Sequence, residues 1–325
     1  TITGPGAATL AVSGGNSSRV FYISSGEDTT EIEVSISGLT ITGGSASGKG
    51  GRNGGGIVNF NEDLTLNGVV VTGNTASGNG GGVASFYYDG AGSLSIIDST
   101  ISENQGYDGG GVYVQDSAAP LLITGSTISG NVAERNGGGV ALYTSSNGAT
   151  ISDTTIRDNG AQGYYYYYSY DRRTPRGETY EGSGGGLHVR YTSGGDVTVV
   201  GSTLSGNLAA HGGGANFYNT YDTITLRNTT ISGNSGGPHG GAIDNDAIHG
   251  VLNIENSTIV DNTASTDAGV PNFGGEINIH NSILANNTGS DISDGVTSYY
   301  NGATRGPGPV VVFNVGHSLI ENTGN

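Results

Sequence analysis

The chain has 325 residues, of which 62 are Gly and only 7 are Pro, and its formal net charge is -17. The excess of acidic residues disfavours binding to nucleic acid or to an anionic membrane surface. The glycines follow no Gly-X-Y period, which excludes a collagen-like chain. Cys is absent, so disulfides are excluded, and no apolar run is long enough to form a transmembrane segment. Because the sequence contains no Met, we expect that a signal segment preceded its first residue and was removed.

A motif of about 25 to 30 residues recurs along almost the whole chain. Each copy contains a Ser/Thr-rich strand, a turn that ends in Asn, a short spacer, and then Gly-Gly-Gly with an aliphatic pair. The copies at 126–142 and 202–217 read STISGNVAERNGGGVAL and STLSGNLAAHGGGANF. A period of this size is typical of a solenoid, in which each unit packs against the next.

Taken in chain order, the copies align in three columns. Apolar and polar residues alternate within each copy, as in Val112–Val114 and Leu187–Val189, and this alternation predicts strands. The aliphatic column before the turn reads Ile41, Val71, Ile101, Ile128, Ile156, Leu204, Ile231, Ile259, Leu284, Leu319. The Asn column reads Asn74, Asn104, Asn131, Asn159, Asn207, Asn234, Asn262, Asn287, Asn322, and the Gly column starts at Gly54, Gly80, Gly109, Gly137, Gly184, Gly212, Gly240.

These columns predict an all-β fold, a single parallel β-helix domain over residues 1–325 with about ten coils of three short strands each. Equivalent residues then stack in ladders, and Asn suits the turn because it tolerates a left-handed backbone and bonds to the Asn above and below. Two stretches interrupt the period, at about 163–181 and 289–316, and we expect both to be loops inserted into the solenoid.

The Gly-Gly-Ala-Ile of Gly240–Ile243 and the Ile-Ser-Gly-Asn of Ile128–Asn131 and Ile231–Asn234 resemble the repeat of polymorphic outer-membrane proteins. That family pairs GGA(I/L/V) with FxxN, and here an aliphatic residue takes the place of the Phe. The opening segment, Ile2–Ser24, also looks like that of large bacterial surface proteins. The resemblance implies a right-handed parallel β-helix at the cell surface, with an adhesive or structural role and no catalytic residues.

One candidate face follows from the coil register. The position after the first aliphatic residue of each Gly-rich strand becomes polar late in the chain, and we expect the residues there to stack on adjacent coils and to point outward. A carboxylate beside Arg or His, with exposed aromatic rings, is typical of carbohydrate-active sites, whereas the structural alternative is ordinary cross-strand pairing. This polar face comprises His188, Arg190, Asn216, Tyr218, Asp244 and Asp246.

The first insertion is a second candidate, because it joins a run of tyrosines to a cluster of arginines on an acidic chain. Tyr and Arg are frequent in binding hot spots, and the alternative is a surface loop without a partner. We expect its partner to be the acidic flank of another subunit or a glycan. The candidate residues are Tyr164, Tyr165, Tyr166, Tyr167, Tyr168, Tyr170, Arg172, Arg173 and Arg176.

His211 and His239 are one coil apart, which would let them share a metal, but the same column elsewhere holds Asn, Asp and Ser and indicates a hydrogen-bonded turn. No phosphate loop or zinc pattern is present, so we predict no cofactor and no metal.

The sequence therefore predicts a non-enzymatic extracellular or cell-surface protein with a structural or adhesive role. Exposed β-helix ends lead us to expect head-to-tail self-association into a fibre or sheath. The alternatives are a carbohydrate-active β-helix, either a lyase or a glycoside hydrolase, and a glycan-binding module.

Overall fold

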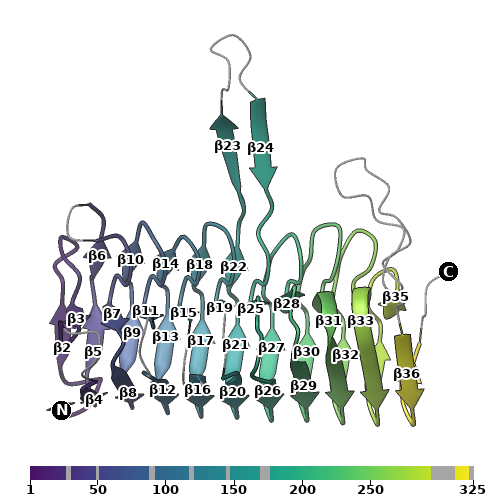
Figure 1. Cartoon of the computed structure of the whole chain (residues 1–325), viewed down its shortest axis with the longest axis horizontal. Coiled ribbons are helices and arrows are strands. Elements are labelled where there is room, and N and C mark those ends of the chain that lie inside the picture. Colours follow the sequence, from purple (N-terminus) through teal and green to yellow (C-terminus); the bar gives the residue numbers. More distant parts are fainter. Residues whose placement is uncertain are drawn as a thin grey trace.

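The computed structural model describes residues 1–26, 31–48, 51–87, 92–116, 121–143, 147–168, 176–293 and 312–321. These residues form strands and turns but no helix. No helix in this described part is therefore long and apolar enough to cross a bilayer. The coils stack in one direction to form a rod, with the two chain ends at its opposite ends (Figure 1).

Each coil contributes one strand to each of three faces, and every pairing between successive coils is parallel. Face 1 contains β3 (Phe21–Ile23), β7 (Ile57–Phe60), β11 (Val83–Phe86), β15 (Val112–Gln115), β19 (Val140–Tyr143), β25 (Leu187–Arg190), β28 (Ala215–Tyr218) and the first parts of β31 (Ile243–Glu255) and β33 (Val270–His280), with β35 (Ile292–Ser293). Face 2 contains β1 (Ile2–Thr3), β4 (Glu33–Ser37), β8 (Asp63–Asn67), β12 (Leu94–Ile97), β16 (Leu121–Thr124), β20 (Ala149–Ser152), β26 (Val197–Val200), β29 (Thr223–Arg227), the second parts of β31 and β33, and β36 (Val312–Gly316).

Face 3 is a continuous sheet of three-residue and two-residue strands. It contains β2 (Ala11–Ser13), β5 (Thr40–Thr42), β9 (Val70–Thr72), β13 (Thr100–Ser102), β17 (Thr127–Ser129), β21 (Thr155–Arg157), β27 (Thr203–Ser205), β30 (Thr230–Ser232), β32 (Thr258–Val260), β34 (Ile283–Ala285) and β37 (Leu319–Ile320). A short fourth ladder follows it, made of β6 (Ser45–Ala46), β10 (Thr75–Ala76), β14 (Gln105–Gly106), β18 (Val132–Ala133) and β22 (Gly160–Ala161).

The predicted fold class, an all-β right-handed parallel β-helix with about three strands per coil, is confirmed. The stacking of the aliphatic column is confirmed from Ile41 to Leu284, and its members are almost fully buried. Its last member was predicted wrongly, because Leu284 pairs with Ile320 while Leu319 pairs with Ile283 and is exposed. Inward aliphatic side chains from all three faces form one core that runs the length of the rod.

A ladder of buried asparagines runs beside this core. From Asn74 to Asn262, each side-chain amide donates to the side-chain oxygen of the next Asn, at 3.0 Å from Asn104 to Asn131 and 2.9 Å from Asn131 to Asn159. The same amide also donates to a backbone carbonyl, for Asn131 that of Ile101 at 2.9 Å. The Asn131 oxygen accepts a second bond from the backbone N–H of Asn104 at 3.0 Å. The ladder therefore satisfies backbone groups of the turn that would otherwise be buried without partners.

The left-handed backbone position in this turn is not the ladder Asn, contrary to the prediction. It is the residue before it, such as Gly130 (φ 64°) and Glu103 (φ 56°). The Gly triplet belongs to the same turn: Gly137 has a φ of 66°, and a Cβ on Gly139 would lie 3.2 Å from the amide nitrogen of Asn159. The Asn column and the Gly column are thus two parts of one packing arrangement.

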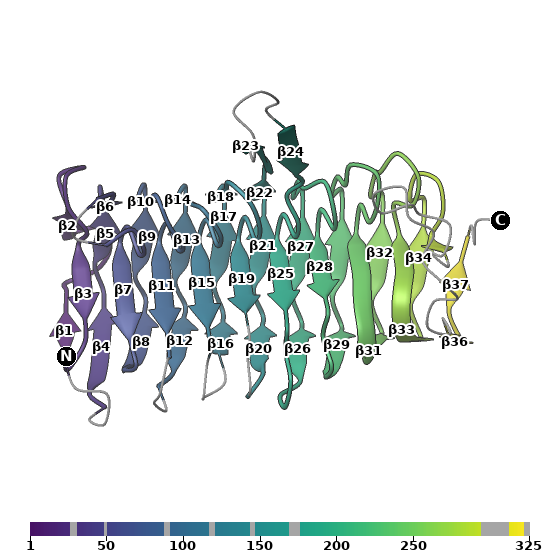
Figure 2. The same cartoon turned by 45° about the horizontal axis from the view of Figure 1, so that its top comes forward.

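The insertion predicted as a loop at about 163–181 contains an antiparallel hairpin instead. Strands β23 (Tyr164–Tyr168) and β24 (Arg176–Tyr180) pair with each other and project away from the rod (Figure 1, Figure 2). The coil register continues across the hairpin, because Asn136 bridges to Ser183 and Val140 pairs with Leu187. Of the insertion predicted at 289–316, residues 294–311 lie outside the described residues.

Replacing one ladder residue tests the role of the Asn column. We expect Asn131→Ala to lower the free energy of unfolding by at least about 2 kcal/mol, because it leaves buried amide and carbonyl groups without partners. The matched control is Thr75→Ala at an exposed position of β10, which should change stability by less than about 0.5 kcal/mol. Denaturant unfolding measures both, and equal stabilities would contradict the assigned role.

Candidate binding face

The candidate residues of face 1 stack as the coil register predicts. Ala141, His188, Asn216 and Asp244 are paired in succession on β19, β25, β28 and β31. The second column pairs Tyr143, Arg190, Tyr218 and Asp246 in the same way. The structure therefore brings all six residues of the predicted polar face together on three adjacent coils.

Toward the N-terminus the same outer surface is aromatic. Rings from successive coils stack with centroids 5.4 Å apart for Phe60 and Phe86, 5.5 Å for Phe86 and Tyr113, and 5.4 Å for Tyr113 and Tyr143. His188 extends this row, with its ring 5.5 Å from that of Tyr143. These side chains form a second apolar cluster outside the main core. It covers the outer side of face 1, which explains why the neighbouring Val58 and Ala84 are fully buried.

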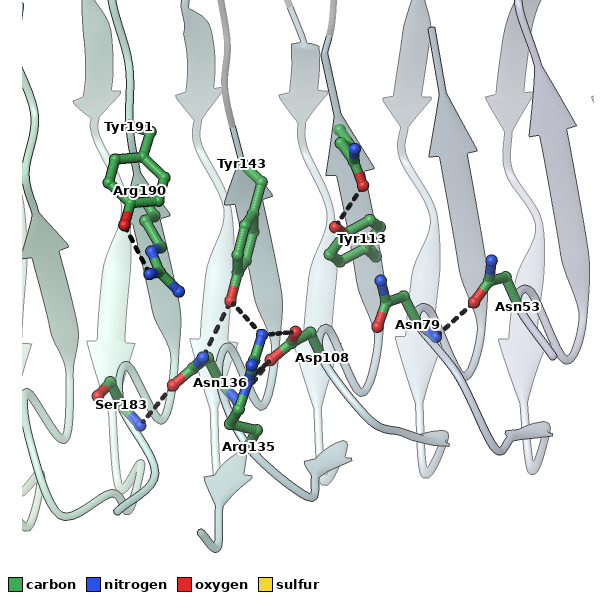
Figure 3. A network of polar contacts seen from close by, with 11 residues as sticks. Asn53, Asn79, Asp108, Tyr113, Arg135, Asn136, Tyr143, Ser183, Arg190 and Tyr191 are labelled. Atoms are coloured by element: carbon green, nitrogen blue, oxygen red, sulfur yellow. Dashed lines mark hydrogen bonds and ion pairs between the residues drawn. The ribbon is translucent and has the colours of Figure 1, made fainter. Parts of the chain in front are cut away.

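A polar network fixes the end of the aromatic row where it meets the polar face (Figure 3). The guanidinium of Arg135 forms an ion pair with Asp108 and donates to the hydroxyl of Tyr143 at 3.4 Å. The amide of Asn136 donates to the same hydroxyl at 2.9 Å. Arg135 is partly buried, which lowers its pKa, but the hydrogen bond and charge of Asp108 outweigh burial and raise it. The network holds the Tyr143 ring against the polar face.

The first polar column points to the outer side of face 1, but its side chains are buried and not accessible to solvent. His188 and Asn216 are each 3 % exposed and Asp244 is 4 % exposed. The flanking turns and the aromatic row exclude solvent from this column. Burial is the main reason that the pKa of His188 falls to about 3, and the positive charges of Arg190 and Arg135 lower it further, while the side chain of Asn216 opposes the shift. His188 is therefore neutral at ordinary pH.

Asp244 has a partner in the turn beside face 1. Its carboxylate lies 3.3 Å from Nδ1 of His211, and Nε2 of the same ring lies 2.8 Å from Glu181. Burial lowers the pKa of His211, but the hydrogen bond and charge of Asp244, followed by those of Glu181, raise it overall. The imidazolium form of His211 is thus held between two carboxylates.

His211 and His239, which the sequence places one coil apart, are neighbours in the structure. The rings of His211 and His239 stack with centroids 6.0 Å apart, and their column also bridges Asn136 and Ser183. His239 lies 3.5 Å from Asp267. No group of three His, Asp or Glu side chains suited to a metal occurs within the described ranges.

The second polar column is partly open to solvent: Tyr218 is exposed, and Arg190 and Asp246 are half-buried. The Arg190 guanidinium lies 4.4 Å from the ring centre of Tyr191 and 5.0 Å from that of Tyr218, and it donates to the Tyr191 hydroxyl at 2.7 Å. Tyr191 and Tyr218 are 38 % and 37 % exposed. Tyr191 was missed from the sequence. It directly follows the Arg190 column, so extending the column comparison by one residue would have found it.

The hairpin holds the other candidate residues. The backbones of Tyr164–Tyr168 and Arg176 lie in β23 and β24. Tyr170, Arg172 and Arg173 lie outside the described residues. The neck of the hairpin is tight, since a Cβ on Gly182 would lie 2.7 Å from the backbone nitrogen of Gly163.

The stacked columns, the continuous core and the Asn ladder define a parallel β-helix repeat protein. Residues 31–173, less than half of the chain, match the family model described as periplasmic copper-binding protein (NosD). No curated protein matches the chain, and no solved structure matches it.

The buried imidazole of His188 should lower the stability of the fold in acid. The pKa of His188 is about 3 in the folded state, below its unfolded value of 6.5, so only the unfolded chain takes up this proton between those pH values. His188 should therefore cost about 1.4 kcal/mol of stability for each pH unit below 6.5. We expect His188→Phe to continue the aromatic row and to remove this loss.

Denaturant unfolding at pH 7.0 and pH 4.5 measures the effect. The advantage of His188→Phe over the original chain should grow as the pH falls. His280→Phe, at an exposed position, is the matched control and should follow the original chain. If the free energy of unfolding depends on pH in the same way for His188→Phe and for the original chain, the assignment of a neutral buried imidazole is wrong.

Proposed function

We propose that this protein is a non-enzymatic, exported β-helix that acts as a rigid adhesive element outside the cytoplasm. The observation that carries the proposal is the β23–β24 hairpin, which projects from the rod while the coils on either side keep their register. A projecting two-stranded ribbon leaves both of its strand edges open to a partner, and its sequence is rich in Tyr and Arg, which are frequent in binding hot spots. The periplasmic location in the description of the matching family supports export.

Burial of the first polar column favours adhesion over catalysis. A general acid or base must reach the substrate, and His188 and Asp244 lie almost entirely below the surface. Asp244 is also paired with His211. These contacts favour a structural role for the column, which anchors the turn to face 1.

The description of the matching family mentions copper, and the matched segment is poorly suited to that metal. Residues 31–173 contain no His, and the whole chain contains no Cys or Met. Imidazole, thiolate and thioether groups are the ligands that copper prefers, whereas this segment offers carboxylates, amides and hydroxyls. Copper binding is therefore left out of the proposed function.

Removing the hairpin tests adhesion. We expect replacement of residues 164–180 by a short Gly-Ser link to preserve the fold, because Gly163 and Gly182 already lie side by side. Beads coated with the protein should adhere to a layer of the same protein, and the deletion should reduce this retention to background.

Two further variants sharpen this test. Replacement of Tyr164–Tyr168 by Ser should reduce retention while keeping the hairpin length. Tyr22→Ser is the matched control, because Tyr22 is exposed and lies far from the hairpin along the rod. Unchanged retention after deletion of the hairpin would exclude it as the adhesive element.

Head-to-tail self-association stays a prediction. Within the described residues, β2 pairs only with β5 and β37 pairs only with β34, so each of these strands has one edge without a partner strand. Open edges of this kind template pairing with another chain. Sedimentation at rising concentration should show species larger than a monomer, and a single monomeric species at high concentration would contradict self-association.

A further inference from the structure

The corner between faces 1 and 2 contains one residue, Tyr191, whose left-handed backbone conformation is unfavourable for its bulky side chain. The residues directly after β7, β15, β25 and β28 all have a left-handed backbone: Asn61 (φ 59°), Asp116 (φ 58°), Tyr191 (φ 58°) and Asn219 (φ 50°). Asn and Asp tolerate this conformation, but for a bulky aromatic residue it is strained. The corner therefore holds Tyr191 with a left-handed backbone where three other coils have Asn or Asp. After β11 the equivalent residue, Tyr87, is buried and has no positive φ.

Core packing does not account for this strain. The Tyr191 ring is 38 % exposed, and its contacts are with Arg190 below it and with Tyr218, whose ring centre is 6.0 Å away. Strained residues persist where the surrounding structure holds them, and they occur often at binding sites. The geometry holds the ring of Tyr191 at the surface rather than in the core.

Exposed rings continue along the rod axis from this point. Tyr218 and Tyr221, 37 % and 52 % exposed, belong to the next coil. His249, on the coil after that, is also exposed and stacks on Tyr221 with centroids 4.8 Å apart. The two ring pairs, Tyr191–Tyr218 and Tyr221–His249, together span three coils, which follow one another at about 4.8 Å. We call Tyr191, Tyr218, Tyr221 and His249 the aromatic corner.

Polar side chains lie beside the aromatic corner. The half-buried guanidinium of Arg190 donates to the Tyr191 hydroxyl, and its Nε is buried. Asp222 directly follows Tyr221 and accepts from the backbone N–H of Gly194 at 2.7 Å, while its second oxygen is buried. Flat rings beside planar donors and acceptors suit a sugar, whose C–H faces pack on aromatic rings and whose hydroxyls both donate and accept.

The net charge of the protein favours neutral sugar ligands over anionic ones. With a net charge of -17, the protein repels polyanions such as nucleic acids and uronate polymers. Exposed rings on three successive coils favour a linear polymer over a compact ligand. We propose that the aromatic corner binds a neutral linear glycan that lies along the rod axis.

This site is separate from the hairpin. The hairpin enters β25 through Ser183, and the aromatic corner begins at the opposite end of that strand, at Tyr191 (Figure 3). Loss of adhesion through the hairpin and loss of glycan binding at the corner are therefore distinguishable in separate variants.

Calorimetric titration tests the proposal, with linear hexasaccharides of β-1,4-glucose, β-1,4-mannose and α-1,4-glucose as neutral probes and hexagalacturonate as the anionic probe. At least one neutral probe should bind the original chain and the hairpin deletion equally. Tyr191→Asn and Tyr221→Ala should each weaken that binding by at least about tenfold. Tyr22→Ala, at an exposed ring outside the corner, is the matched control and should bind normally.

Thermal unfolding distinguishes loss of the site from loss of the fold. Tyr191→Asn should melt at or above the midpoint of the original chain, because Asn relieves the left-handed strain. If Tyr191→Asn is instead less stable, Tyr221→Ala decides the outcome, since its backbone position carries no such strain. The proposal is overturned if no neutral probe binds, if only hexagalacturonate binds, or if both variants bind as tightly as the original chain.

Discussion

The hydrogen-bonded ladder of buried asparagines is the constraint on which the rest of the structure depends. Each amide joins its own turn to both neighbouring coils: the Asn131 amide donates to the side chain of Asn159 on the next coil and to the backbone carbonyl of Ile101 on the preceding coil. A buried ladder tolerates no shift in register, because a slipped coil would leave several polar groups without partners. It also places Gly139 against an amide, which excludes larger residues there. Because the ladder fixes the register of the coils, aliphatic side chains of the right size are sufficient to fill the core.

On the outer side of face 1, the same coil register places apolar residues in one part of the rod and polar residues in another. The same column is apolar near the N-terminus, at Val58 and Ala84, and polar later, at His188 and Asp244. Both halves are buried, and in the polar half one carboxylate oxygen of Asp244 pairs with His211. Pairing is incomplete, because Oδ1 of Asn216 and Oδ1 of Asp244 are buried without a hydrogen-bond partner.

The hairpin and the aromatic corner lie in turns and corners, because these positions do not enter the Asn ladder or the aliphatic core. The hairpin leaves the rod through a tight neck between Gly163 and Gly182. The aromatic corner begins where Tyr191 replaces the Asn or Asp of other coils. A solenoid can therefore carry separate binding elements on a scaffold whose stability lies elsewhere.

The sequence by itself determined the fold class, the stacking of equivalent residues and the position of the insertion, because a parallel β-helix repeats its contacts at each coil and the repeat is visible in the letters. The tertiary structure decided what covers each column. His188, Asn216 and Asp244 are outward on their strands, yet neighbouring rings and turns bury them, and no single repeat contains those neighbours. The strain at Tyr191 was equally hidden, because a backbone angle depends on the geometry of the corner and not on the identity of the residue.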